Sequence, residues 1–212
     1  MNENNNGRGL FYGVIGVATL IVAIIGATFA YFSVSANIAN NSDIAGSTVE
    51  LSDTTITGTL TRETPSTVSM VPLKTEDLQK GITGEGGQKC IDENGAKVCD
   101  IYTLTINNTS NAPVSLAGNL TITATDMADL RWSLLESTTS ATGATAKEVS
   151  DTVIVANELL AAKTGTKTYH FVIWFNETEL NQNTQAGKSY TGTVAFSAAN
   201  GGKITAQFSS GS

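Results

Sequence analysis

The hydrophobic pattern of this chain changes sharply near its start, and the change divides the sequence into two parts. Residues 10 to 32 form an almost wholly apolar run, and no charged side chain occurs between Arg8 and Asp43. At about 1.5 Å per residue, a helix of this run spans roughly the hydrocarbon core of a bilayer. The pattern therefore predicts a signal peptide or a membrane anchor over residues 1–30.

Two positions at the end of the apolar run carry the small residues that a signal peptidase requires. The first predicted cleavage lies between Ala30 and Tyr31, and the alternative lies between Ala36 and Asn37. The run is longer than a typical signal peptide core, so an uncleaved anchor is the competing interpretation. Because Arg8 precedes the run, the positive-inside rule places the rest of the chain outside the cell or on its surface.

The residues after the first cleavage position alternate between apolar and polar. Phe32, Val34, Ala36 and Ile38 occupy every second position, which is the period of a strand with one buried face. We interpret residues 31–47 as an N-terminal extension that contains a candidate donor strand, able to pair within its own domain or to add to a neighbouring copy. The competing interpretation is that these residues are only the tail of the signal.

From residue 48 onward, short segments with the period of a strand are separated by clusters of turn residues. The composition is rich in Thr, Ser, Asn, Gly and Val, which favours strands and turns over helices. The pattern predicts an all-β fold over residues 48–212, an antiparallel β-sandwich of the jelly-roll or immunoglobulin-like kind. The expected strands lie at residues 48–51, 54–60, 67–71, 97–107, 116–124, 130–136, 153–156, 167–175, 189–198 and 204–208.

Three segments have special features within this pattern. Residues 74–80 predict a helix of at most two turns, which Thr75 caps and Gly81 stops. Residues 157–163 fit either one helical turn or a wide connection. The segment 167–175 is apolar on both faces, so we expect it in the middle of a sheet that is covered on both sides.

The two cysteines flank a predicted hairpin. A two-residue type I′ turn at Asn94 and Gly95 would place Cys90 directly opposite Cys99, at a position where the side chains of paired strands approach closely. In an exported protein these two cysteines are expected to form a disulfide. Closing a ring of this size contributes about 2 to 3 kcal/mol in the loop-entropy model.

Charge and residue content restrict the chemistry. The net charge of −7 argues against nucleic acid as a partner. Because His170 is the only histidine, a zinc motif with two histidines is excluded. Residues 92–95 and 126–129 carry oxygen ligands that suit calcium, but neither completes a known calcium loop. The sequence predicts no catalytic residue, no metal site and no cofactor, with calcium as a weak alternative.

Four stretches resemble a known family. Residues 26–33 and 45–52 resemble the signal end and first mature strand of the camelysin and TasA family of bacterial surface and biofilm-matrix proteins. Residues 102–108 and the strand around Trp174 are similar to the core of that family. The resemblance implies a jelly-roll-like sandwich, export by the general secretory route, and processing near Ala30 by a dedicated signal peptidase. It also implies polymerisation into extracellular fibres through an N-terminal donor strand.

These observations predict an exported structural subunit of a cell-surface or biofilm-matrix fibre, not an enzyme. Its expected partners are further copies of itself, the signal peptidase, and other matrix or surface components. A membrane-anchored surface module for binding or adhesion is the first alternative. A metallopeptidase of the camelysin type is the second, although the sequence holds no zinc motif to support it.

Overall fold

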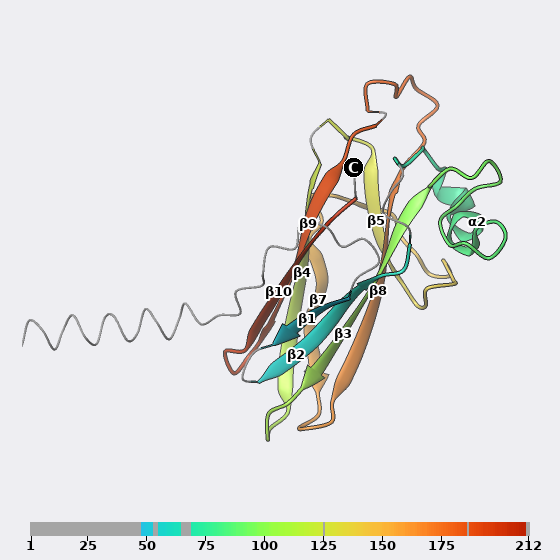
Figure 1. The fold of residues 1–212 in the computed structure, drawn as a ribbon. Helices are drawn as coiled ribbons and strands as arrows, with labels where there is room; N and C mark the ends of the chain where they lie inside the picture. Colours follow the sequence, from blue (N-terminus) through green and yellow to red (C-terminus); the bar gives the residue numbers. More distant parts are fainter. Residues whose placement is uncertain (1–47, 53–54, 65–68, 125, 186, 211–212) are drawn as a thin grey trace, which may run out of the picture. The chain divides into compact units, whose positions relative to one another are not determined.

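The computed structural model describes residues 48–52, 55–64, 69–124, 126–185 and 187–210. These residues form an antiparallel β-sandwich, which confirms the predicted fold class (Figure 1). The six-stranded sheet has the order β1-β2-β3-β8-β5-β6, and the four-stranded sheet has the order β10-β9-β4-β7. The strands are β1 (Thr48–Ser52), β2 (Ile56–Arg62), β3 (Cys99–Asn108), β4 (Val114–Ala124), β5 (Leu130–Leu135), β6 (Lys147–Glu148), β7 (Val153–Leu160), β8 (Thr166–Phe175), β9 (Tyr190–Ala198) and β10 (Lys203–Ser209).

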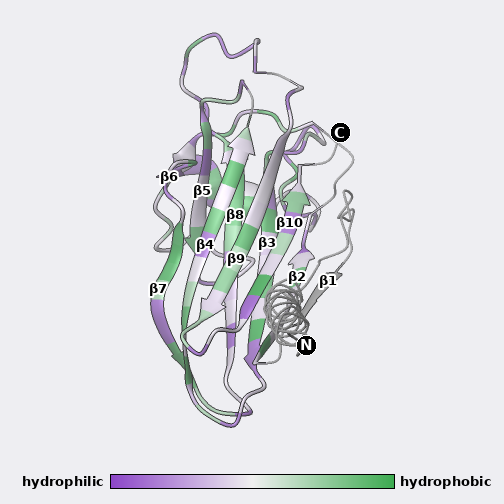
Figure 2. Cartoon of the chain, turned by 90° about the vertical axis from the view of Figure 1, so that its left-hand side faces the viewer, coloured by the Kyte–Doolittle hydropathy of each residue, from purple (hydrophilic) through white to green (hydrophobic). Residues whose placement is uncertain are grey.

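The main core lies between the two sheets. Along β4 and β9, every second residue is buried, so one face of each strand enters the core while the other carries small and mostly polar side chains. Figure 2 shows this as bands of hydrophobic residues that alternate with more polar ones. Aromatic rings fill the centre, where Tyr102 and Phe171 stack with their centroids 5.1 Å apart and Phe208 packs against both.

Strand β8 has the central position that its sequence predicts. It pairs with β3 on one side and with β5 on the other. Phe171 and Ile173 point into the main core, whereas Val172 and Trp174 belong to a second apolar cluster on the outer face of the six-stranded sheet. We call this second group the outer cluster; its buried members are Leu78, Ile82, Cys90, Val98, Cys99, Ile101, Leu135, Val172 and Trp174.

A short helical segment covers the outer cluster. The 3-10 helix η1 (Thr75–Asp77) leads into α2 (Leu78–Thr83), so the predicted helix exists but extends beyond its expected end. Gly81 does not stop the helix. It lies buried inside α2, where an added Cβ would come within 2.7 Å of the Leu73 side chain. The residue after the helix is Gly84, whose φ of 64° ends it.

The hairpin before β3 differs from the prediction in its register. A type I′ turn needs positive φ at both central residues, but only Gly95 has it. The side chain of Asp92 accepts the amide of Asn94 at 2.9 Å, which stabilises a different loop. The pairing is therefore shifted by one residue, and Ile91 pairs with Lys97.

Two other expectations are corrected. Residues 157–163 were expected to form a helical turn or a wide connection, but β7 continues through Asn157 to Leu160. A register shift opposite Leu116 and Gly118 accommodates this strand against β4. In the expected strand at 67–71, the described part contributes a single bridge, from Met70 to Lys97.

Candidate functional site

The residues predicted for export and strand donation lie outside the described part of the chain. This holds for both cleavage positions, Ala30 with Tyr31 and Ala36 with Asn37, and for the donor residues Phe32, Val34, Ala36 and Ile38. These assignments therefore stay predictions. Within the described ranges, no helix is long and apolar enough to cross a membrane.

The two cysteines do form the predicted disulfide. Their Cα atoms are 4.9 Å apart, and both residues are fully buried beneath α2. The shifted hairpin register means that Cys90 does not face Cys99 directly, since the amide of Val98 donates to the carbonyl of Cys90 at 2.9 Å. The backbone of Cys90 is in the left-handed conformation, with a φ of 59°, and from there its side chain reaches Cys99. The disulfide holds the hairpin against the outer cluster.

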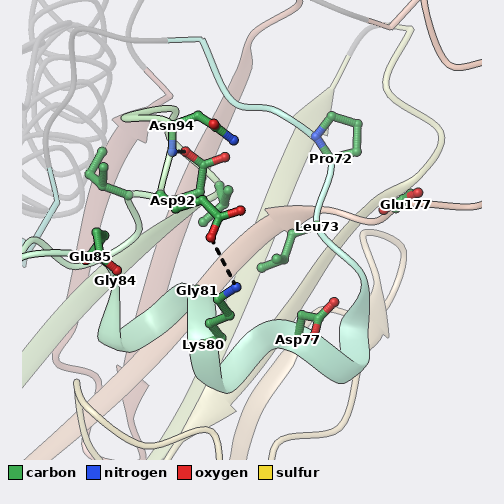
Figure 3. Close-up of a pocket in the computed structure, with 13 residues that line it drawn as sticks. Pro72, Leu73, Asp77, Lys80, Gly81, Gly84, Glu85, Asp92, Asn94 and Glu177 are labelled. Atoms are coloured by element: carbon green, nitrogen blue, oxygen red, sulfur yellow. Dashed lines mark hydrogen bonds and ion pairs between the residues drawn. The ribbon is translucent and has the colours of Figure 1, made fainter.

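A pocket of about 390 Å³ opens between α2 and this hairpin (Figure 3). Leu73, Ile91 and Val98 contribute apolar side chains to its lining. Much of the remaining lining consists of acidic side chains. One of them, Glu93, forms an ion pair with Lys80 at 3.9 Å. The acidic lining residues are Asp77, Glu85, Asp92, Glu93 and Glu177.

The first three residues of the calcium candidate at 92–95 line this pocket, but the hydrogen bonds of Asp92 stabilise the loop itself. Asp92 Oδ1 accepts the amides of Asn94 and Ala96 at 2.9 and 2.7 Å. Among the residues that the structure describes, no group of three or more His, Cys, Asp or Glu side chains is arranged to hold a metal ion. The arrangement suits an uncharged or cationic group with an apolar stem better than an anion.

The second calcium candidate, at residues 126–129, also has a structural arrangement. Asp129 Oδ2 accepts hydrogen bonds from the side-chain amides of Gln182 and Gln185, both at 2.7 Å. Asp126 forms an ion pair with Lys188 at 3.5 Å. These contacts join the loop before β5 to the loop before β9.

His170 lies on β8, on the outer face of the six-stranded sheet. Its Nδ1 is 3.0 Å from Oγ1 of Thr103 on β3. Burial lowers the pKa of His170, while the charge of Glu63 opposes this shift. The side chain thus forms a cross-strand pair with a threonine, as expected for a structural histidine.

A buried charged group is the feature that sequence reasoning missed. We call it the ionic cluster, and it consists of Arg62, Lys97, Asp100, Tyr102 and Tyr190, with Thr64 beside them. Lys97 and Asp100 have no exposed surface, and their Nζ and Oδ1 atoms are 2.8 Å apart. The only signal in the sequence is an aspartate within a strand that is otherwise apolar at its start.

The ionic cluster connects the two sheets. Asp100 on β3 accepts the hydroxyl of Tyr190 on β9 at 2.7 Å, and it is 3.4 Å from Arg62 Nε on β2. Arg62 donates to the carbonyl of Ser209 and, at 2.7 Å, to the hydroxyl of Tyr102. Burial raises the pKa of Tyr190, and the nearby charge of Asp100 raises it further. Burial lowers the pKa of Lys97, and the charge of Asp100 partly offsets this effect.

The four-stranded sheet ends in two strands that differ at their outer edges. Within the described chain, β7 pairs only with β4, and β10 pairs only with β9. On β7, Val153 and Leu159 are 51% and 73% exposed. At the end of β10, the carbonyl of Ser209 accepts hydrogen bonds from Arg62 and Tyr102. The two edges therefore offer different surfaces to a further strand.

Comparison with known proteins gives no family for this chain. No family model matches it, and no curated protein matches it. Among solved structures, a FixG-related protein from Vibrio parahaemolyticus is 11% identical, with a TM-score of 0.28 over 52% of this chain and 76% of its own. The copper-bound PCuAC domain from PmoF2 is 11% identical, with a TM-score of 0.26 over 75% of this chain and 94% of its own. At these scores the likenesses support no statement about function.

Proposed function

We propose that this protein is an exported structural subunit of a bacterial cell-surface or biofilm-matrix fibre. In this proposal, residues 32–38 of one copy add as a strand to the sheet edge of the next copy. The observation that carries the proposal is the edge strand β7, which exposes Val153 and Leu159 and pairs on one side only among the described residues. Long edge strands with exposed apolar side chains are the usual acceptors of an added strand.

The donor and the acceptor match in chemistry. The donor segment is uncharged, with apolar side chains at every second position. Figure 2 shows hydrophobic stretches along β7, at the edge of the four-stranded sheet. Main-chain hydrogen bonds would supply affinity for the added strand, and the alternate apolar side chains would set its register.

The first experiment tests the donor segment. Replacing Val34 and Ile38 with Asp places charges on the face that the proposal buries, so polymerisation of the purified, processed protein should be lost. The matched control replaces Ser33 and Ser35 with Asp on the other face of the same segment, and it should still polymerise. Light scattering and electron microscopy give the readout. Fibres of normal yield from the Val34 and Ile38 variant would overturn the proposal.

The second experiment tests the acceptor edge. Leu159→Asp on β7 should prevent growth of fibres from seeds of the unaltered protein. Asn157→Asp is the control, because this exposed position tolerates a carboxylate that can still accept the Ser115 hydroxyl. If both variants elongate seeds equally, strand addition occurs at another edge.

The pocket beside α2 favours a second candidate function, a membrane-anchored surface module for binding or adhesion. Its apolar and acidic lining residues would accept a lysine or arginine side chain of a partner. Full-length protein in the membrane fraction, without polymer, would support this alternative. Processed protein in high-mass extracellular material would support the fibre subunit.

A further inference from the structure

The ionic cluster places an amine and a carboxyl group in contact where water has no access. Lys97 Nζ is 2.8 Å from Asp100 Oδ1, and both side chains have 0% exposure. Reacting groups held this close avoid the entropy cost of meeting, and the absence of water favours condensation over hydrolysis. We propose that Lys97 and Asp100 become joined by an isopeptide bond between Nζ and Cγ after the protein folds.

The neighbours of Asp100 are arranged to activate its carboxyl group. Tyr190 donates its hydroxyl to Oδ2 at 2.7 Å, and Thr64 donates its hydroxyl to Oδ1 at 2.9 Å. Attack on Cγ develops negative charge on the oxygen that does not leave, here Oδ2. The Tyr190 hydroxyl is already placed at that oxygen, and the guanidinium of Arg62 adds positive charge nearby.

The amine has the environment that a nucleophile requires. Burial disfavours the charged form of Lys97, although Asp100 opposes this. A proton passes from Nζ to Oδ1 across the 2.8 Å contact, which leaves a neutral amine beside a neutral carboxylic acid. Neutral groups avoid the cost of keeping two charges away from water.

The reaction balances without a further reagent. The lone pair of Nζ forms a bond to Cγ, and the bond between Cγ and Oδ1 breaks. Oδ1 leaves with its own proton and a second proton from Nζ, as one water molecule. One cation and one anion are consumed together, so the formal charge of the ionic cluster does not change when the bond forms.

Peptide mapping of the full chain, after reduction and alkylation of the disulfide, tests this bond. Trypsin cleaves after free lysine, so an unmodified chain yields separate peptides for residues 90–97 and 98–131. The isopeptide bond blocks cleavage at Lys97. We expect a single peptide of residues 90–131, lighter than its sequence by one water molecule, with fragments that join positions 97 and 100. Two separate peptides of unaltered mass would overturn the proposal.

The matched variant is Lys97→Arg, which keeps a cation and a trypsin site but cannot form this amide. It should give the two peptides at their sequence masses. Loss of water that persists in this variant would assign the loss to cyclisation of Asp100 alone and would also overturn the proposal. Because the primary result comes from the unaltered protein, the test does not depend on whether the variant folds.

Discussion

The main core and the outer cluster are both apolar and buried, but they are built in different ways. The main core is enclosed by two sheets, whose side chains interdigitate from both sides. The outer cluster has a sheet on one side only, and on the other it has the short helix α2 and the hairpin that the disulfide closes. A six-residue helix is too short to be stable alone. The comparison indicates that covalent and backbone constraints replace a second sheet in the outer cluster.

The largest expected effect comes from breaking the main core. Phe171→Ala removes a ring that stacks on Tyr102 and contacts Phe208, so we expect a loss of about 3 to 5 kcal/mol in the free energy of unfolding. Denaturant titration measures this loss. Thr168→Ala, at an exposed position on the same strand, should change stability by no more than about 0.5 kcal/mol.

The next largest effect is predicted for the covalent constraint on the outer cluster. Replacing Cys90 and Cys99 together with Ala should cost about 2 to 3 kcal/mol, because the hairpin loop is no longer closed in the unfolded chain. Denaturant titrations with and without a reducing agent measure this difference. The reducing agent should weaken the unaltered protein and leave the double variant unchanged. Equal sensitivity of both proteins would contradict the assigned role.

A smaller effect is expected from the backbone constraint at the end of α2. Gly84 has a φ of 64° and a ψ of −178°, a combination that essentially only glycine adopts, and its Cβ would meet the Gln88 carbonyl at 1.8 Å. Gly84→Ala should therefore cost about 1 to 3 kcal/mol in thermal or denaturant unfolding. Gly86→Ala is the matched control. It also has positive φ, but its Cβ would lie in open space, so its cost should be clearly smaller.

The smallest expected effect is a pH dependence on the outer face of the six-stranded sheet. Burial lowers the pKa of His170 in the folded protein, so as the pH falls below about 6.5 the unfolded chain takes up the proton first. This histidine therefore contributes a loss of stability in acid. His170→Gln should make the denaturation midpoint vary less between neutral pH and pH values below about 6.5. An unchanged pH profile would contradict this assignment.

The sequence predicts the main core better than the outer cluster, for a physical reason. Alternation in β4 and β9 reflects half-buried strands, and the two apolar faces of β8 reflect a central strand; both patterns can be read locally. The hairpin register depends instead on which hydrogen bonds Asp92 makes, and the end of α2 depends on the backbone of Gly84 and its close approach to Gln88. Both are decided by contacts that the order of residues does not reveal.

The candidate sites, like the outer cluster, can be predicted from local sequence patterns only in part. The disulfide follows from two cysteines and a turn, so the pairing of Cys90 with Cys99 is predictable although its geometry is not. The ionic cluster joins Arg62, Lys97 and Tyr190 over large separations in the chain, and no local pattern marks them. Asp100 alone is conspicuous, as a charge in an apolar strand.

The occupied carbonyl of Ser209 has a consequence for assembly. A guanidinium and a phenol hydroxyl already bind this acceptor at the outer edge of β10, so an incoming strand cannot use it as a hydrogen-bond partner. At edge β7, Lys147 Nζ donates to the carbonyl of Val153 at 3.2 Å, a contact at the start of the strand, and Leu159 is exposed further along it. If growth joins β7 of one copy to the N-terminal donor segment of another copy, each contact joins two unlike surfaces. Such head-to-tail contacts do not pair two copies about a twofold axis, and where their rotation does not close a ring they produce a filament with two chemically different ends.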